Sequence, residues 1–204
     1  MKYCRFRAAG SEQYGVVETR DEGEVITRIL SLAPEKSGGD LEGVPTRRFE
    51  PLSLMQAELL PPVQPSKIVC VGRNYREHAD ELGHAVPKVN DFTARDLQDK
   101  DGQWTRAKGF DTFCPVGPMV AEGLDPWAGV TVETRVNGEV RQQGNTRDFI
   151  FPLEVIIRYI AEVMTLFAGD LIATGTPKGV GPVVAGDVIE ISVAGIGTLR
   201  NTVE

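Results

Sequence analysis

Short runs of alternating apolar and polar residues fill the first part of the chain. Three such runs, at residues 3–6, 14–18 and 24–29, are separated by turn residues at positions 9–11 and 21–23. Alternation with a period of two places every second side chain on one face of a β-strand. The pattern therefore predicts a small β meander at the N-terminus.

The next part of the chain loses this alternation. Residues 33–66 are rich in proline and glycine, which interrupt regular structure. We expect a linker that packs along the main domain, with one helical turn within residues 52–60. An apolar run at residues 67–72 then predicts a buried strand. After it, Asn74 begins a capping-box spacing that predicts a helix over residues 75–82.

The second half contains a hairpin pattern and the longest helix pattern. Residues 130–136 alternate and are followed by Asn-Gly, the dipeptide that most favours a tight hairpin turn. From Pro152 onward, apolar residues recur every three or four positions until Gly169, which is typical of an amphipathic helix. Further strands are expected at residues 170–173 and 187–193. Since strands dominate, the sequence predicts an α+β, β-rich fold.

Composition narrows the class of protein. The 204 residues include 41% hydrophobic and 25% charged residues, which is typical of a soluble globular protein, with a net charge of −7. There is no basic run, so a nucleic-acid partner is not expected. No apolar run has the length of a membrane span or the form of a signal peptide. The three cysteines form no CxxC motif and are interpreted as reduced thiols of a cytoplasmic protein.

Residues 89–118 mix acids, bases and aromatic side chains without a regular period. An active site needs this mixture, because charged groups do chemistry while apolar groups exclude water. Asp91 suits a hard cation such as Mg²⁺ or Mn²⁺, although alone it is more typical of a turn or helix cap. Arg95, Gln98 and Lys108 can hold a carboxylate and stabilise an enolate, or else form surface ion pairs.

Two further features lie outside this stretch. His78 and Glu81 are three residues apart on the expected helix, so their side chains can meet and form a general base. Two polar residues on a solvated helix face are the plainer interpretation, and spacing alone favours it. The loop at residues 174–181 follows a strand and offers backbone amides to an anion, but it does not match the P-loop pattern.

Taken together, these segments resemble the fumarylacetoacetate hydrolase family from about residue 67 to the C-terminus. The matching segments follow the family order. They are Gly-Arg-Asn-Tyr with His78 and Glu81, Asn-Asp-Phe-Thr-Ala-Arg-Asp, Trp-Thr-Arg-Ala-Lys, Phe-Cys-Pro-Val-Gly-Pro, Val-Asn-Gly-Glu, and Gly-Asp-Leu-Ile-Ala-Thr-Gly-Thr-Pro-Lys-Gly-Val-Gly-Pro. The N-terminal meander also resembles the small first domain of many bacterial members.

The resemblance implies a β-roll catalytic domain at residues 63–204, after a small N-terminal β domain and linker at residues 1–62. It implies a metal-dependent enzyme, usually a homodimer, with Mg²⁺ or Mn²⁺ as the cofactor. The substrates would be small 2-oxo acids, β-dicarbonyl compounds or dienedioates, as in aromatic catabolism. The reactions would be hydrolysis of C–C bonds, decarboxylation or isomerisation.

The resemblance also implies roles for single residues. His78 and Glu81 correspond to a dyad that activates water, and Lys108 to a group that stabilises an enolate. Asp91 corresponds to one of three metal carboxylates. Arg95, Gln98 and Thr176 correspond to groups that bind the substrate.

One departure from the family bears on these roles. Members carry several tens of residues between the dyad helix and the Asn-Asp segment, including a Glu-x-Glu pair that supplies the other metal carboxylates. Here Lys88 runs directly into Val89. A single carboxylate holds Mg²⁺ poorly. The alternative to an active enzyme is therefore a catalytically impaired relative that keeps the scaffold and binds a small carboxylate ligand.

Overall fold

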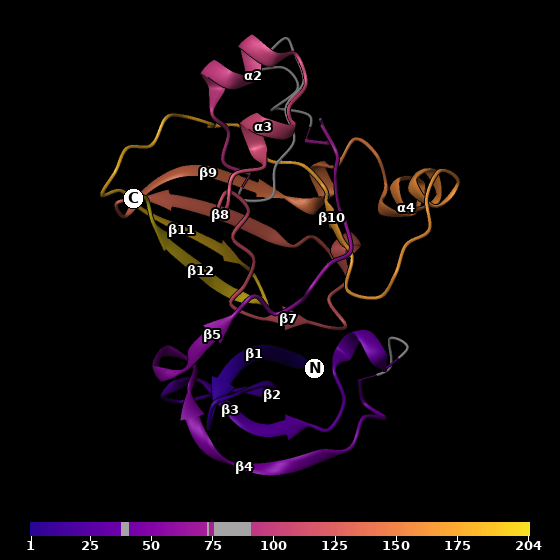
Figure 1. Ribbon diagram of the computed structural model, residues 1–204, viewed down its shortest axis with the longest axis vertical. Coiled ribbons are helices and arrows are strands. Elements are labelled where there is room, and N and C mark those ends of the chain that lie inside the picture. Colours follow the sequence, from indigo (N-terminus) through magenta and orange to yellow (C-terminus); the bar gives the residue numbers. More distant parts are fainter. Residues whose placement is uncertain (38–40, 73, 76–90) are drawn as a thin grey trace.

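The computed structural model spans all 204 residues and describes residues 1–37, 41–72, 74–75 and 91–204. Figure 1 shows a six-stranded sheet in the lower part of the molecule and a four-stranded sheet with short helices above it. Three predictions lie outside the described residues. They are the pair His78 and Glu81, the helix expected to carry that pair, and the junction between Lys88 and Val89.

The lower sheet is built around three consecutive strands. β1 (Lys2–Ala8), β2 (Ser11–Arg20) and β3 (Gly23–Leu30) pair antiparallel, and the predicted meander is confirmed. Cys4 and Phe6 are both 0% exposed and share one core cluster, because residues two apart on a strand face the same side.

Residues 33–66 contain more regular structure than a linker. β4 (Thr46–Ser53) and β5 (Glu58–Leu60) extend the same sheet, whose order is β4-β3-β2-β1-β5. Between them the 3-10 helix η2 (Leu54–Gln56) supplies the expected helical turn. Pro51 is tolerated because β4 is an edge strand, where a missing N–H leaves no bond of the ladder unmade. The prediction of a linker is wrong for these strands.

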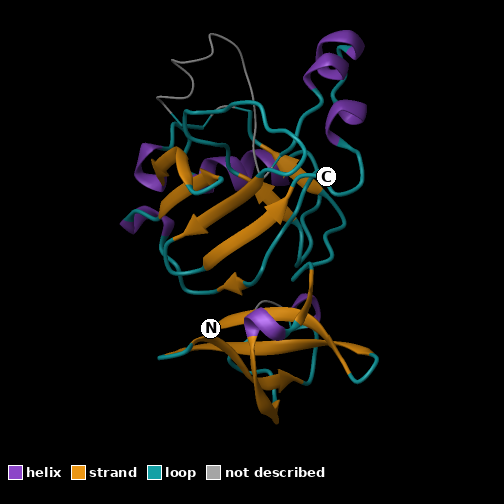
Figure 2. Cartoon of the chain, turned by 90° about the vertical axis from the view of Figure 1, so that its left-hand side faces the viewer, coloured by secondary structure: helices purple, strands orange, loops and turns teal. Residues whose placement is uncertain are grey.

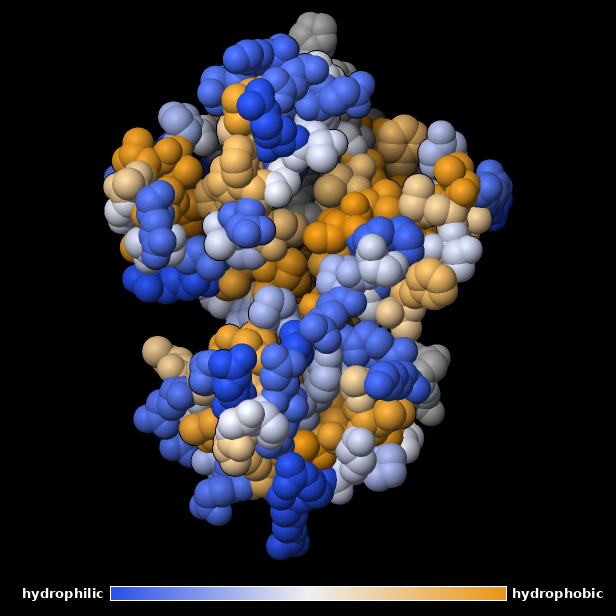
Figure 3. All heavy atoms as spheres, in the orientation of Figure 1, coloured by the Kyte–Doolittle hydropathy of each residue, from blue (hydrophilic) through white to orange (hydrophobic). Residues whose placement is uncertain are grey.

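A segment from the second half of the chain joins the same sheet. β7 (Val120–Ala121) pairs with the start of β1, and Met119 just before it packs in the core cluster of the lower sheet. The surface narrows between the two parts of the molecule (Figure 3). The division into domains at residues 1–62 and 63–204 stays a prediction.

The upper sheet is antiparallel and has the order β12-β11-β8-β9. Its strands are β8 (Thr131–Val136), β9 (Glu139–Asn145), β11 (Val188–Val193) and β12 (Gly197–Thr202). Both residues of the Asn-Gly turn between β8 and β9 have positive φ, 52° and 82°. These angles match a two-residue hairpin turn, so the predicted hairpin is confirmed.

A third, smaller sheet lies beside the upper one. β6 (Ile68–Cys70) pairs in parallel with β10 (Leu171–Ala173). The Lys67 Nζ atom lies 2.5 Å from the Asp170 carboxylate and so ties the starts of the two strands together. Ile68 is 40% exposed, because the described part of this sheet has only two strands. The expectation that this strand is buried is wrong.

The longest helix of the described residues is shorter than its sequence pattern. α4 (Leu153–Ala161) buries Ile156 and Ile160, as the apolar period predicts. Val163, the next apolar position, is 70% exposed, so no packing supports another turn. The helix therefore ends eight residues before Gly169, where the pattern placed its end.

The remaining helices are short. They are α2 (Arg95–Asp101), α3 (Thr105–Lys108), η1 (Pro34–Lys36), η3 (Pro126–Ala128) and η4 (Thr146–Asp148). Strands dominate the chain (Figure 2), and the predicted α+β, β-rich fold is confirmed. In the part of the chain that is described, no helix has the length and apolarity to cross a membrane.

Candidate active site

A cavity of about 540 Å³ lies between the segment that precedes α2 and the upper sheet. Three parts of the chain form its walls. They are the segment with Asp91, Phe92, Thr93 and Arg95, the strand residues Thr134, Val136, Arg141, Gln142 and Ile189, and the loop residues Gly179, Val180, Gly181, Pro182 and Val183. The mixed central stretch and the loop after β10 therefore meet, although Arg95 and Gly179 are 84 positions apart in the chain (179 − 95).

Backbone hydrogen bonds fix the segment that precedes α2. The N–H of Phe92 donates to the carbonyl of Phe113 at 3.1 Å, and the N–H of Ala94 donates to the carbonyl of Ala107 at 2.9 Å. The rings of Phe92 and Phe113 lie 6.1 Å apart. These contacts join the start of the central stretch to its later part, around residues 107–113.

An ion pair stands at the edge of the cavity. Lys108 Nζ contacts the carboxylate of Asp91 and donates to Thr93 Oγ1 at 2.8 Å. The two charged side chains are 15% and 9% exposed, so water screens their attraction only weakly. Two predicted site residues are thereby brought together, and Thr93, which was not predicted, joins them.

The predicted residues on α2 also contact each other. Arg95 Nη1 donates to Gln98 Oε1 at 2.7 Å. Gln98 is 9% exposed, and its Nε2 atom has no hydrogen-bond partner among the described residues. A buried donor without a partner costs free energy. Gln98 itself is not among the described residues that line the cavity.

Thr176 is hydrogen-bonded to Gln142, a residue that lines the cavity and was not predicted from the sequence. Gln142 Nε2 on β9 donates to Thr176 Oγ1 at 3.0 Å and to the carbonyl of Pro177 at 2.8 Å. These bonds hold the loop after β10 against the upper sheet. No pattern in the sequence indicated this contact, because Gln142 lies on an ordinary hairpin strand.

The two thiols near the site are not activated nucleophiles. Burial, followed by the nearby Asp91 carboxylate, raises the pKa of both Cys70 and Cys114. A raised pKa keeps a thiol protonated at neutral pH, whereas a nucleophilic cysteine needs a lowered one. Cysteine chemistry is therefore not supported here.

The residues described fit a divalent metal poorly. Among them, no group of three or more His, Cys, Asp or Glu side chains is placed to hold an ion. Asp91 is the only acidic residue among the described residues that line the cavity, and its carboxylate contacts Lys108. Hard cations require several oxygen ligands. The described residues by themselves therefore do not form a magnesium or manganese site.

Comparison with known proteins identifies the family. Residues 86–204 match the family described as Fumarylacetoacetate (FAA) hydrolase C-terminal, and residues 1–62 match the one described as Rv2993c-like, N-terminal. The first match covers more than half of the chain. The chain belongs to the fumarylacetoacetate hydrolase family, and the predicted resemblance is confirmed.

Several relatives of this chain are named as enzymes. Oxaloacetate tautomerase YisK of Bacillus subtilis is 33% identical, over 74% of this chain and 74% of its own length. The 2,4-didehydro-3-deoxy-L-rhamnonate hydrolase of a Sphingomonas species is 30% identical, over 100% of this chain and 96% of its own length. A crystal structure of 5-carboxymethyl-2-hydroxymuconate delta-isomerase from Mycobacterium smegmatis has a TM-score of 0.83 at 30% identity, over 100% of this chain and 99% of that one.

The alignment with the Sphingomonas hydrolase is longer than this chain. It extends over 280 residues, whereas this chain has 204, so at least 76 aligned positions have no counterpart here. This difference agrees in size with the block of several tens of residues that the sequence lacks. Its place between Lys88 and Val89 stays a prediction.

Proposed function

We propose that this protein is an enzyme that moves a proton on, or cleaves, a small 2-oxo acid, β-dicarbonyl compound or dienedioate. The observation that carries the proposal is the contact of Lys108 with Asp91 and Thr93, two residues that line the cavity together with Arg95. The cavity volume of about 540 Å³ lies within the range of small-molecule sites.

Lys108 is the group that we expect to stabilise negative charge. Removal of a proton next to a carbonyl, or loss of a carbon fragment from it, leaves an enolate. A weakly exposed ammonium group stabilises an enolate oxygen strongly, because little water screens the charge. Arg95 holds the substrate carboxylate.

His78 and Glu81 are the residues that we expect to activate water in reactions that consume it. Tautomerisation and isomerisation need only proton transfer, whereas hydrolysis needs an activated water molecule. We therefore expect the dyad to be essential for hydrolysis. Replacement of His78 or Glu81 by alanine should abolish acylpyruvate hydrolysis, and full hydrolytic activity in both variants would contradict the assignment.

Three further properties of the protein remain part of the proposal. Family resemblance supports a bound Mg²⁺ or Mn²⁺ with Asp91 as a ligand, a homodimer and a cytoplasmic location. Since the described residues do not form a metal site, none of the steps above passes through a metal. Titration with Mg²⁺ and Mn²⁺ by calorimetry, for the wild type and Asp91→Ala, measures whether an ion binds and whether Asp91 holds it.

The alternative function is a catalytically impaired relative that binds a small carboxylate. Among the described residues that line the cavity, Asp91 alone is acidic, and this favours the alternative because family chemistry uses three metal carboxylates. Oxalate, which resembles the enolate of pyruvate, separates the two functions. Oxalate binding that requires Mg²⁺ or Mn²⁺ supports the enzyme. An equal affinity for oxalate with added metal and with a metal chelator supports the impaired relative.

Activity toward oxaloacetate and acylpyruvates tests the main proposal. Tautomerisation is followed by the ultraviolet absorbance of the enol, for the wild type, Lys108→Met and the control Lys100→Met. Lys100 lies on α2 and is exposed. We expect Lys108→Met to lower kcat by about a hundredfold or more and the control to leave it unchanged. Absence of turnover in the wild type would overturn the proposal.

A further inference from the structure

Strand β9 contains a bulge at Arg141. In the pairing with β8, Thr134 lies opposite Gln142 and Arg135 lies opposite Val140, so Arg141 has no partner residue. A bulge of this kind inserts one extra residue and changes the direction of its side chain.

This bulge decides which side chains line the cavity. In a regular strand, consecutive residues point to opposite faces of the sheet. Here the consecutive residues Arg141 and Gln142 both line the cavity, together with Thr134. In a regular strand, only one of these two consecutive residues would face the cavity. The bulge therefore adds the guanidinium group of Arg141 to the wall that contains Gln142.

Arg141 is exposed and lines the cavity. Its Nη1 atom lies 3.5 Å from the position that a Cβ atom on Gly181 would occupy, so the side chain extends toward the loop that forms another wall of the cavity. Within the part of the chain that is described, no hydrogen bond or ion pair engages this guanidinium. The nearby Asp187 carboxylate is already bonded to the N–H of Val184 at 2.9 Å and to Asn137 Nδ2 at 2.8 Å.

Among the described residues that line the cavity, two are cations. Asp91 contacts Lys108, whereas Arg95 and Arg141 line the cavity as cations. The carboxyl of Asp187 lies close enough to Arg141 for the arginine to contribute, after the two hydrogen bonds of that carboxyl, to its lowered pKa. They stand on different walls, Arg95 at the start of α2 and Arg141 on β9 of the upper sheet. A linear molecule with one carboxylate at each end matches two such groups, since each arginine can bind a carboxylate with two hydrogen bonds.

We propose that Arg141 is a specificity-determining residue that binds the carboxylate remote from the reacting end of a dianionic substrate. This inference rests on the proposed function, because it names the substrates of the same cavity as dicarboxylates. Arg95 holds the oxo-acid end, and Arg141 selects against molecules with an apolar tail.

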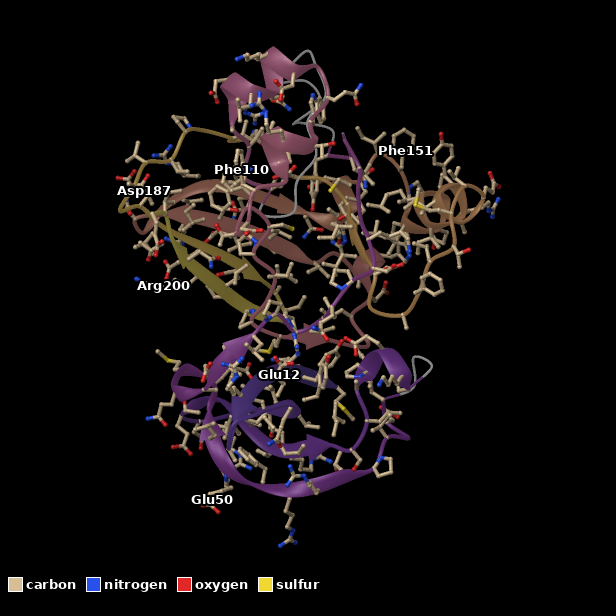
Figure 4. The ribbon with its side chains drawn as sticks, viewed as in Figure 1. Glu12, Glu50, Phe110, Phe151, Asp187 and Arg200 are labelled. Carbon is tan, nitrogen blue, oxygen red and sulfur yellow. The ribbon has the colours of Figure 1, made fainter. Side chains whose placement is uncertain are left out.

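Two ligands of equal length test this selection. 2-Oxoglutarate and 2-oxopentanoate share the oxo-acid end and five carbons, and they differ in a carboxylate or a methyl group at the far end. Dissociation constants are measured by calorimetry for the wild type, Arg141→Met, Arg141→Lys and the control Arg200→Ala. Arg200 lies on the edge strand β12 of the same sheet (Figure 4) and does not line the cavity.

We expect the wild type and the control to prefer 2-oxoglutarate by about tenfold or more, the usual effect of one charge-assisted pair. Arg141→Met should remove the preference and leave the affinity for 2-oxopentanoate unchanged, and Arg141→Lys should retain part of it. A preference that survives in Arg141→Met overturns the inference. Equal weakening of both ligands also overturns it, because Arg141 would then bind the shared end.

The measurement separates this inference from the proposed function. Binding needs no turnover, so a preference that depends on Arg141 in a protein without activity supports the inference and contradicts the enzyme. Turnover of oxo acids with no preference between the two ligands supports the enzyme and contradicts the inference. Circular dichroism of Arg141→Met checks the fold.

Discussion

Lys108 Nζ contacts the carboxylate of Asp91, a residue 17 positions earlier in the chain, at a point where both side chains are largely buried. The turns of α2 and α3 bring them together, because Ala94 and Ala107 are joined by a backbone hydrogen bond of 2.9 Å. The pair links the stability of this segment to the charge of the cavity.

Replacement of Asp91 by asparagine should destabilise the protein. Lys108 would keep its charge in a place that is only 15% exposed, and breaking such a pair typically costs about 3 kcal/mol. We expect urea unfolding to show a loss of this size. Asp96→Asn, at an exposed position on α2, is the matched control and should change the free energy of unfolding by less than about 0.5 kcal/mol. Equal stability of Asp91→Asn and wild type would show that the pair contributes nothing.

Gly179→Ala should distort the loop that forms one wall of the cavity. Gly179 has a φ of 97°, and a Cβ atom there would lie 2.0 Å from the carbonyl oxygen of Arg141. Gly186→Ala is the control, because φ is 93° there and no atom lies within 4 Å of the added carbon. The control should lose about 1 kcal/mol of unfolding free energy from backbone strain alone. Thermal unfolding should show a clearly larger loss in Gly179→Ala, and equal losses would argue against the close contact.

Gln142→Ala should loosen the same loop from the upper sheet. The variant loses the bonds to Thr176 Oγ1 and to the carbonyl of Pro177, which are worth about 1 kcal/mol each. We expect faster amide hydrogen exchange in residues 174–181 and weaker oxalate binding. Gln143→Ala, at the exposed neighbouring position, should leave both unchanged. Unchanged exchange in Gln142→Ala would mean that other contacts hold the loop.

Acid should weaken the link between β6 and β10. The ion pair with Lys67, followed by N–H and hydroxyl groups of Phe167 and Ser66, holds the pKa of Asp170 well below its usual range. A lowered pKa means that the charged form stabilises the folded state, so this stabilisation is present at neutral pH and is lost as the pH falls below about 4.

Urea unfolding between pH 7 and pH 3 measures this effect. Asp170→Asn should be less stable than the wild type at pH 7, and the difference should shrink toward pH 3. Asp111→Asn, at an exposed position, should follow the wild type throughout. A difference that stays constant with pH would exclude the charge of Asp170 as its cause.

Local patterns were enough to predict much of the fold. The alternating runs predicted β1 to β3, and the Asn-Gly dipeptide predicted the β8–β9 hairpin. Both signals act over a few residues, since a strand period and a positive φ are set by neighbours in the chain. The motif order likewise indicated the family that the comparisons identify.

Other parts of the fold depended on contacts that the local sequence does not contain. β4 and β5 exist because they find partners on β3 and β1, although their segment is rich in proline and glycine. α4 ends where its apolar side chains no longer meet a buried surface. A linear pattern cannot tell whether a partner surface is present.

The sequence by itself determined the strand-rich class, the hairpin turn and which charged residues are candidates for chemistry. The roles of His78 and Glu81 stay predictions from resemblance. Only the tertiary structure decided that Asp91 pairs with Lys108, that Gln142 holds Thr176, and that a bulge directs Arg141 into the cavity. The physical reason is that turns and periods depend on adjacent residues, whereas ion pairs and cavity walls depend on side chains that meet only after distant segments have packed.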